Sequence, residues 1–270
     1  MHLMIKIYSL LILSFSFLFS SGHKTIEASY DVTYGIFGKL GVADTSVKID
    51  HNSYSINIIA KATGFARILS NGKEERYTST GSIVNNTFIP KTFTKYTKSN
   101  TKNRLRKYTF DYENNKVLVE KTTRKIVYNK DVSQSYSYDD NESPQVKTKW
   151  LKEESKEILD FFAANDLLSL FFNIKQFIPN FNQGNNYTLK AIGANKDNGK
   201  INIIIPSGEK YKDLEESLDM DDSKKFIAQI NQKIFSSKKG ELLISLNDYG
   251  ICNKAVLKDV LLFGDIVGEM

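Results

Sequence analysis

The feature that most constrains this chain is a long succession of segments in which apolar and polar side chains alternate. Between residues 26 and 138 the alternation recurs repeatedly, and residues 29–34 show it most clearly. Turn-forming Asn, Asp and Ser separate the segments, as at residues 50–53 and 85–86. A period of two is that of a strand with one buried face. The pattern therefore predicts a meander of antiparallel strands.

The apolar spacing becomes helical between residues 153 and 177, where glutamates and lysines are expected to form the polar face of the first turns. Asn165 and Asp166 interrupt this stretch, and Asp166 is the predicted N-cap of a second helix. That second helix is apolar on nearly all sides, which favours burial against the sheet. Pro179 ends the helical pattern.

The strand period then returns, and the acidic stretch 214–222 is read as a connector. The expected strands are residues 187–192, 200–205, 226–235, 241–247 and 255–263. We therefore expect a mainly β fold, an antiparallel curved sheet or incomplete barrel, with a helical insertion at about residues 150–178 packed on one side. Residues 23–270 are predicted to form a single domain of this kind.

The first 22 residues have the three parts of a secretory signal peptide. Lys6 gives a cationic start, residues 7–19 are almost wholly apolar, and the small residues of 20–22 suit cleavage near Gly22. An uncleaved N-terminal anchor is the alternative. No later stretch approaches the roughly 18 apolar residues of a spanning helix. The expectation is an exported, periplasmic protein without a transmembrane helix in its mature part.

The one cysteine, Cys252, lies far from the signal segment and has no second cysteine to pair with. This position excludes the usual lipoprotein anchor and an internal disulfide, and a lone cysteine is most often a small buried apolar residue. The formal net charge of +6 is spread along the chain without a recognition motif, so nucleic acid is not an expected partner. It is compatible with an anionic lipid or acidic glycan surface, or simply with solubility.

Catalytic and metal signatures are weak. Beyond the signal segment the histidines are His23 and His51, neither in a hydrolase or zinc motif, and both are interpreted as solvated. The acidic residues around Asp219 lack the glycine and distal glutamate of a calcium loop. We therefore expect no enzyme activity, no metal and no cofactor. Asn141 stands in an Asn-x-Ser acceptor, with an acid two places before it, and is a candidate N-glycosylation site.

Several ordered stretches together resemble the exported bacterial family catalogued as DUF3108, a domain of unknown function. They are residues 30–35 with 40–43, 62–66 with 79–81, Pro90, 110–112, 166–172, 243–248 and 263–264. The resemblance implies a mainly antiparallel β domain in the periplasm. It implies no activity, and no catalytic residue follows from it.

The leading hypothesis is a non-catalytic envelope protein that binds an amphiphile, either a lipid or an envelope glycan, between the sheet and the helical segment. The candidate ligand-facing apolar residues are Phe161, Phe162, Leu168, Phe171 and Phe172. A dry core made by the same side chains is the alternative at this point. A second hypothesis is a structural or assembly partner of an outer-membrane or capsule machine, with exposed strand edges binding envelope proteins. An envelope hydrolase is the third.

Overall fold

The computed structural model describes residues 22–128, 148–194, 197–219, 223–230, 241–247, 250–258 and 264–270. Most of the predicted signal peptide and the candidate acceptor Asn141 lie outside these ranges. Within them, the protein is mainly β, with 61% of residues in strands of one 14-stranded antiparallel sheet that does not close into a barrel. The expected fold class is therefore confirmed.

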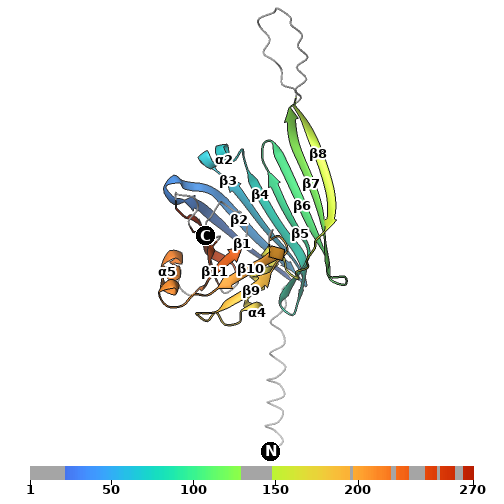
Figure 1. The fold of residues 1–270 in the computed structure, drawn as a ribbon. Coiled ribbons are helices and arrows are strands. Elements are labelled where there is room, and N and C mark those ends of the chain that lie inside the picture. The colour runs from blue at the N-terminus through green and yellow to red at the C-terminus, as the bar shows by residue number, and fades with distance from the viewer. Residues whose placement is uncertain are drawn as a thin grey trace, which may run out of the picture.

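The first eight strands follow one another along the sheet as consecutive hairpins (Figure 1). They are β1 (His23–Tyr34), β2 (Gly38–Asp50), β3 (Ser53–Ala62), β4 (Glu74–Val84), β5 (Thr87–Lys98), β6 (Lys102–Asp111), β7 (Lys116–Tyr128) and β8 (Thr148–Ile158). Two short helical elements interrupt the hairpin turns, η1 (Gly35–Phe37) before β2 and α2 (Gly64–Leu69) before β4. This order is the predicted meander.

The remaining strands continue the same sheet from the other side of β1. They are β9 (Asn186–Lys190), β10 (Lys200–Ile204), β11 (Lys224–Ile230), β12 (Glu241–Leu246), β13 (Cys252–Leu257) and β14 (Ile266–Glu269). The strand β14 pairs with β1 on one side and with β13 on the other, so the last strand of the chain joins the two halves. The strands β8 and β9 are left as the two edges.

The helical prediction is correct at its centre and wrong at its start. Residues 148–158 form β8, whereas α3 (Leu167–Phe172) and α4 (Ile174–Phe177) supply the helices. Every side chain of β8 is exposed, and its charges pair across to β7, as Lys156 does with Glu120 at 2.7 Å. The Glu and Lys residues expected on a polar helix face therefore line an edge strand. The acidic stretch expected as a connector belongs largely to a helix, α5 (Glu209–Leu218), followed by a part outside the described residues.

The core lies on the inner face of the sheet, which is the face that α3 and α4 cover. Cross-strand partners on this face run from Val47 through Ile56, Ser79, Phe93 and Tyr108 to Val119. The sheet also turns back on itself, because Gly193, just beyond β9, accepts a hydrogen bond from Lys95 Nζ on β5 at 2.6 Å. Residues from 159 to 178 join core clusters with both halves of the sheet, which confirms that the helical segment packs on one side.

Candidate functional site

An apolar cavity of about 180 Å³ lies between α3 and the inner face of the sheet. Strands β1, β2 and β3 form one wall, and β12 and β13 form the other. The lining residues are Tyr30, Thr45, Ile58, Leu168, Phe171, Phe172, Leu242, Ile244, Leu246, Gly250, Ile251, Cys252 and Ala255. None of these described side chains carries a formal charge.

The pleat and register of the strands place these side chains together. Thr45 and Ile58 are direct cross-strand partners on β2 and β3, so both point to the inner face. Ile244 and Ala255 are partners in the same sense on β12 and β13. Because β14 lies between β13 and β1, the two walls belong to a single continuous sheet. The cavity is therefore a product of the curvature of that sheet.

The third wall is α3, and a buried carboxylate fixes its position. Asp166 accepts hydrogen bonds from the backbone N–H groups of Leu168 at 2.7 Å and Ser169 at 3.0 Å, while Ser169 Oγ accepts from the Asp166 N–H. This reciprocal capping box confirms the predicted N-cap. The other carboxylate oxygen accepts from Ser79 Oγ on β4 at 2.6 Å, and Ser79 also bonds to Tyr54 on β3 at 3.0 Å.

Two amides hold the end of the helical segment on the β4–β5 hairpin. The side chain of Asn173 accepts from Phe88 N–H and donates to Phe88 C=O, each at 2.8 Å, and so completes a backbone pair at the start of β5. Gln176 accepts from Thr87 Oγ1 at 2.6 Å and donates to the carbonyl of Asn86 at 2.7 Å. Together with Asp166, these bonds hold α3 at a fixed distance from the sheet.

The two ionisable groups in the lining are kept neutral. Burial raises the pKa of the Cys252 thiol to about 12, and burial also raises the pKa of Tyr30 well above its ordinary value, against a hydrogen bond with Thr45. An apolar cavity of about 150 Å³ lined by aliphatic and aromatic side chains stays dry and accepts a molecule the size of benzene. This cavity is thus suited to an aromatic ring or a short hydrocarbon segment.

The five predicted ligand-facing residues separate into two groups. Leu168, Phe171 and Phe172 line the cavity. Phe161 and Phe162 instead pack in a different core cluster over β5, β6 and β7, where the ring of Phe162 meets that of Tyr112 edge-on at 5.8 Å between centroids. A role in ligand binding stays a prediction for the first group, while the geometry gives the second group no place in the cavity wall.

Most of the lining was not predicted, above all the residues of β12 and β13. Leu242, Ile244 and Leu246 share one face of β12 because they stand two apart, but Leu243 and Ser245 between them are buried as well, so no polar face marks which side points inward. The missing information is which strands face α3, and that depends on the pairing of β14 with β1. The strand β14 has only four residues, too few for alternation to mark it.

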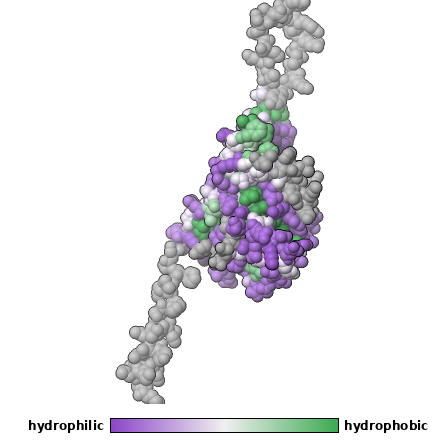
Figure 2. All heavy atoms as spheres, turned by 90° about the vertical axis from the view of Figure 1, so that its left-hand side faces the viewer, coloured by the Kyte–Doolittle hydropathy of each residue, from purple (hydrophilic) through white to green (hydrophobic). Residues whose placement is uncertain are grey.

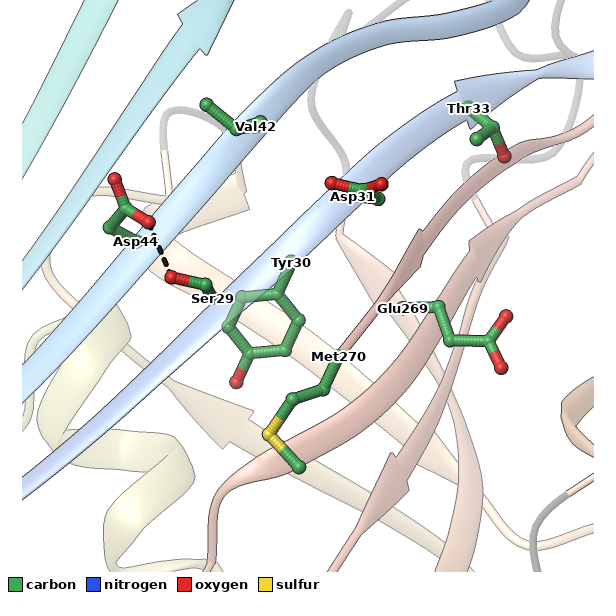
Figure 3. A pocket seen from close by; sticks show the side chains of 8 residues that line it. All are labelled: Ser29, Tyr30, Asp31, Thr33, Val42, Asp44, Glu269 and Met270. Atoms are coloured by element: carbon green, nitrogen blue, oxygen red, sulfur yellow. Dashed lines mark hydrogen bonds between the residues drawn. The ribbon is translucent and has the colours of Figure 1, made fainter.

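A larger hollow of about 490 Å³ lies on the sheet near the junction of β1, β2 and β14 (Figure 3). Its carboxylates already have partners in the protein: Asp31 pairs with Lys39 at 2.7 Å, and Asp44 accepts a hydrogen bond from Ser29 at 2.7 Å. Glu269 pairs with Lys254 at 3.5 Å. We interpret this hollow as a solvated polar surface, because its acids are exposed and paired.

Among the described residues, His23, Asp50 and His51 offer three ligand atoms close enough for one divalent cation. The register of β1 and β2 places His23 opposite Asp50, and His51 follows Asp50 in the turn. Asp50 Oδ1 lies 3.2 Å from His23 Nδ1 and 2.6 Å from His51 Nδ1. Each histidine is exposed, as expected from the sequence, but their proximity was not predicted, because it depends on this register.

The fold and the cavity define a class of mainly β proteins with a curled, open sheet and an apolar pocket beneath a short helix. A family model described as "Protein of unknown function (DUF3108)" matches residues 29–143. The match confirms, over these residues, the resemblance drawn from the sequence. Searches of curated proteins and of solved structures found no match. No helix among the described residues is both long and apolar enough to span a membrane.

Proposed function

We propose that this protein is a non-catalytic carrier or sensor of an amphiphile, whose apolar part enters the cavity beneath α3. The observation that carries the proposal is the uncharged lining, which combines aromatic rings of α3 with aliphatic side chains from two walls of one sheet. A water-soluble ligand would leave its polar groups without partners in such a lining, which costs free energy. A hydrocarbon chain has no polar groups and so incurs no such cost in the cavity.

The cationic part of the inner face supports an anionic headgroup on the same ligand. Ile58 in the cavity wall is the cross-strand partner of Tyr77, which is the partner of Lys95, and Lys95 is the partner of Arg106. With strands about 4.8 Å apart, Lys95 lies roughly 10 Å from the wall. Lys95 Nζ already donates to the carbonyl of Gly193 at 2.6 Å, and burial lowers the pKa of Lys95 to about 8. The exposed guanidinium of Arg106, one strand further from the wall, is therefore the cation open to the head of an amphiphile whose chain enters the cavity.

The binding of 11-(dansylamino)undecanoic acid, followed by its fluorescence, tests this proposal. Ala255→Phe places a ring in the cavity wall and is expected to weaken binding at least about tenfold, because it removes the space for the chain. Ala164→Phe is the matched control, since Ala164 is exposed on the segment before α3. Equal binding by the two variants, or none by the unaltered protein, would refute the proposal.

A second candidate function, assembly with another envelope protein, is favoured by the edge strand β8. All of its 11 residues are exposed, and it pairs with β7 on one side alone. An open edge of this length is a template for strand addition by a partner. Recovery of a stoichiometric protein partner, with no effect of Ala255→Phe on its binding, would favour this candidate over the first.

An exported, periplasmic location after cleavage near Gly22 belongs to the same proposal. Its support is the cationic, apolar and small-residue order of residues 1–22. The mass of the recovered protein tests it, because cleavage would leave a chain beginning at about His23. A full-length mass in the soluble fraction would contradict it.

A further inference from the structure

One end of the sheet, which we call the α2 end, exposes large apolar side chains. It comprises residues 35–41, 61–76 and 97–103, the three turns β1–β2, β3–β4 and β5–β6 with their flanking residues. The short helix α2 has no buried residue, and Phe65, Ile68 and Leu69 are 68%, 75% and 72% exposed. Phe37 in the neighbouring turn is 52% exposed. Exposed apolar side chains gathered in this way mark an interaction surface.

The three turns form one connected surface. The N–H of Thr63 donates to the carbonyl of Leu40 at 2.8 Å, which holds α2 against the start of β2. The β3–β4 and β5–β6 turns are joined by the N–H of Asn100 and the carbonyl of Asn71 at 2.9 Å. Figure 2 shows apolar side chains together with polar ones on the upper part of the face that bears α2.

The charge of this end identifies the kind of partner. The three ranges contain seven Lys or Arg residues and two Glu residues. The glutamates pair with Lys73 and Arg76, so that Lys61, Arg67 and Lys98 are left exposed around α2. At the opposite end, the turns within residues 48–53, 84–91 and 111–117 contain three Lys and three acidic residues. The positive charge is therefore concentrated beside the exposed apolar helix.

We propose that the α2 end docks on the surface of an anionic phospholipid bilayer. Phe65, Ile68 and Leu69 enter the interfacial region, and the surrounding lysines and arginine contact lipid phosphates. The combination of apolar insertion and basic charge is the one that binds peripheral proteins to anionic membranes. This inference does not rest on the cavity, although membrane docking would place a lipid carrier beside its source.

Sedimentation with vesicles tests the proposal on the protein as it is purified after expression of the whole chain. The vesicles are phosphatidylcholine alone, or phosphatidylcholine with about 30% phosphatidylglycerol, at about 0.05 M and about 0.5 M salt. Tight binding is expected to the anionic vesicles at low salt, with about a tenfold loss at high salt. All variants carry the same N-terminus, so any contribution from residues 1–21 is common to them.

The decisive variant is Phe65→Ser with Ile68→Ser and Leu69→Ser, which should weaken binding at least about tenfold. Its control is Val84→Ser with Ile158→Ser, exposed apolar residues at the opposite end of the sheet. The part played by charge is tested with a triple variant at the α2 end, Lys61→Glu with Arg67→Glu and Lys98→Glu, which should weaken vesicle binding. Its control is a triple variant at the opposite end, Lys48→Glu with Lys91→Glu and Lys116→Glu. Each variant must keep the circular dichroism spectrum and the urea unfolding midpoint of the unaltered protein, which separates a loss of folding from a loss of docking.

Three results would overturn the proposal. One is equal vesicle binding by the α2 variant and its control. Another is vesicle binding whose affinity changes neither with the anionic lipid content nor with the salt concentration. The third is a dimer in the absence of vesicles that the α2 variant dissociates, since the end would then be a contact between copies. Vesicle binding without any fatty-acid binding would uphold this inference and refute the cavity proposal.

Discussion

Replacing Asp166 by Asn should remove a pH dependence of folding stability that a buried carboxylate creates. Burial raises the pKa of Asp166 to about 6 from an ordinary value of 3.8, although hydrogen bonds from Ser79, Ser169 and Leu168 act in the opposite direction. The folded state therefore binds a proton more tightly than the unfolded state. The stabilisation is fully present below about pH 3.8 and is lost as the pH rises through about 6.

The size of the effect follows from the shift of about two pKa units, which corresponds to about 3 kcal/mol of unfolding free energy. An Asn side chain keeps the oxygen that caps α3, and its NH₂ group can donate to Ser79 Oγ while Ser79 donates to Tyr54. Asp166→Asn should thus be at least as stable as the unaltered protein at about pH 7.5 and gain little at about pH 4.5. Asp166→Ala, which leaves two backbone N–H groups without partners and the Ser79 hydroxyl with Tyr54 alone, should lose about 2–4 kcal/mol.

Urea unfolding followed by circular dichroism at several pH values between about 4.5 and 7.5 measures these differences. The pKa values of other carboxylates, such as Glu75, are lowered, so their stabilisation is lost at lower pH and cancels in the comparison of variants. Parallel stability curves for Asp166→Asn and the unaltered protein across this range would contradict a raised pKa of Asp166. A lower stability of the Asn variant at high pH would contradict it as well.

Two further predictions concern packing. Gly81→Ala should destabilise the protein by at least about 2 kcal/mol, since a Cβ at this position would overlap the carbonyl of Ile89, whereas Gly268→Ala, which meets nothing nearby, should change the unfolding midpoint little. Comparable losses in both variants would contradict this. The pKa of the Cys252 thiol is raised from 9.0 to about 12. Below pH 9 its thiolate population should therefore be roughly a thousandfold smaller than that of an ordinary thiol, and it should react with a disulfide reagent more slowly in the folded protein by a similar factor. Reaction as fast as in denaturant would show that the cavity wall is open.

The sequence predicts the first half of the fold well because its signals are local. Turn residues such as Asn85 and Asn115 adopt positive φ angles at the hairpin ends, and the buried side chains of β3 and β6 stand two apart, Tyr54 with Ile56 and Tyr108 with Phe110. The N-cap at Asp166 is also a local signal, and the structure confirms it. These features need no knowledge of distant parts of the chain.

The failures occur where stability comes from distant pairing. The strand β8 has no buried face, so neither periodicity nor composition distinguishes it from a charged helix until β7 is placed beside it. The helix α5 buries Leu214 and Leu218 alone, one turn apart, in an otherwise polar sequence. The cavity wall from β12 and β13 requires the four-residue strand β14 to join them to β1. Tertiary context decides all three.

Native mass spectrometry of protein purified without detergent, compared with Ala255→Phe, shows whether a ligand occupies the cavity. The unaltered protein is expected to carry an additional non-covalent mass that is extracted into organic solvent, and the variant much less of it. A bare chain mass for the unaltered protein, also after incubation with lipid extract, would contradict ligand binding in the cavity. So would an equal additional mass on both proteins, because the ligand would then lie outside the cavity.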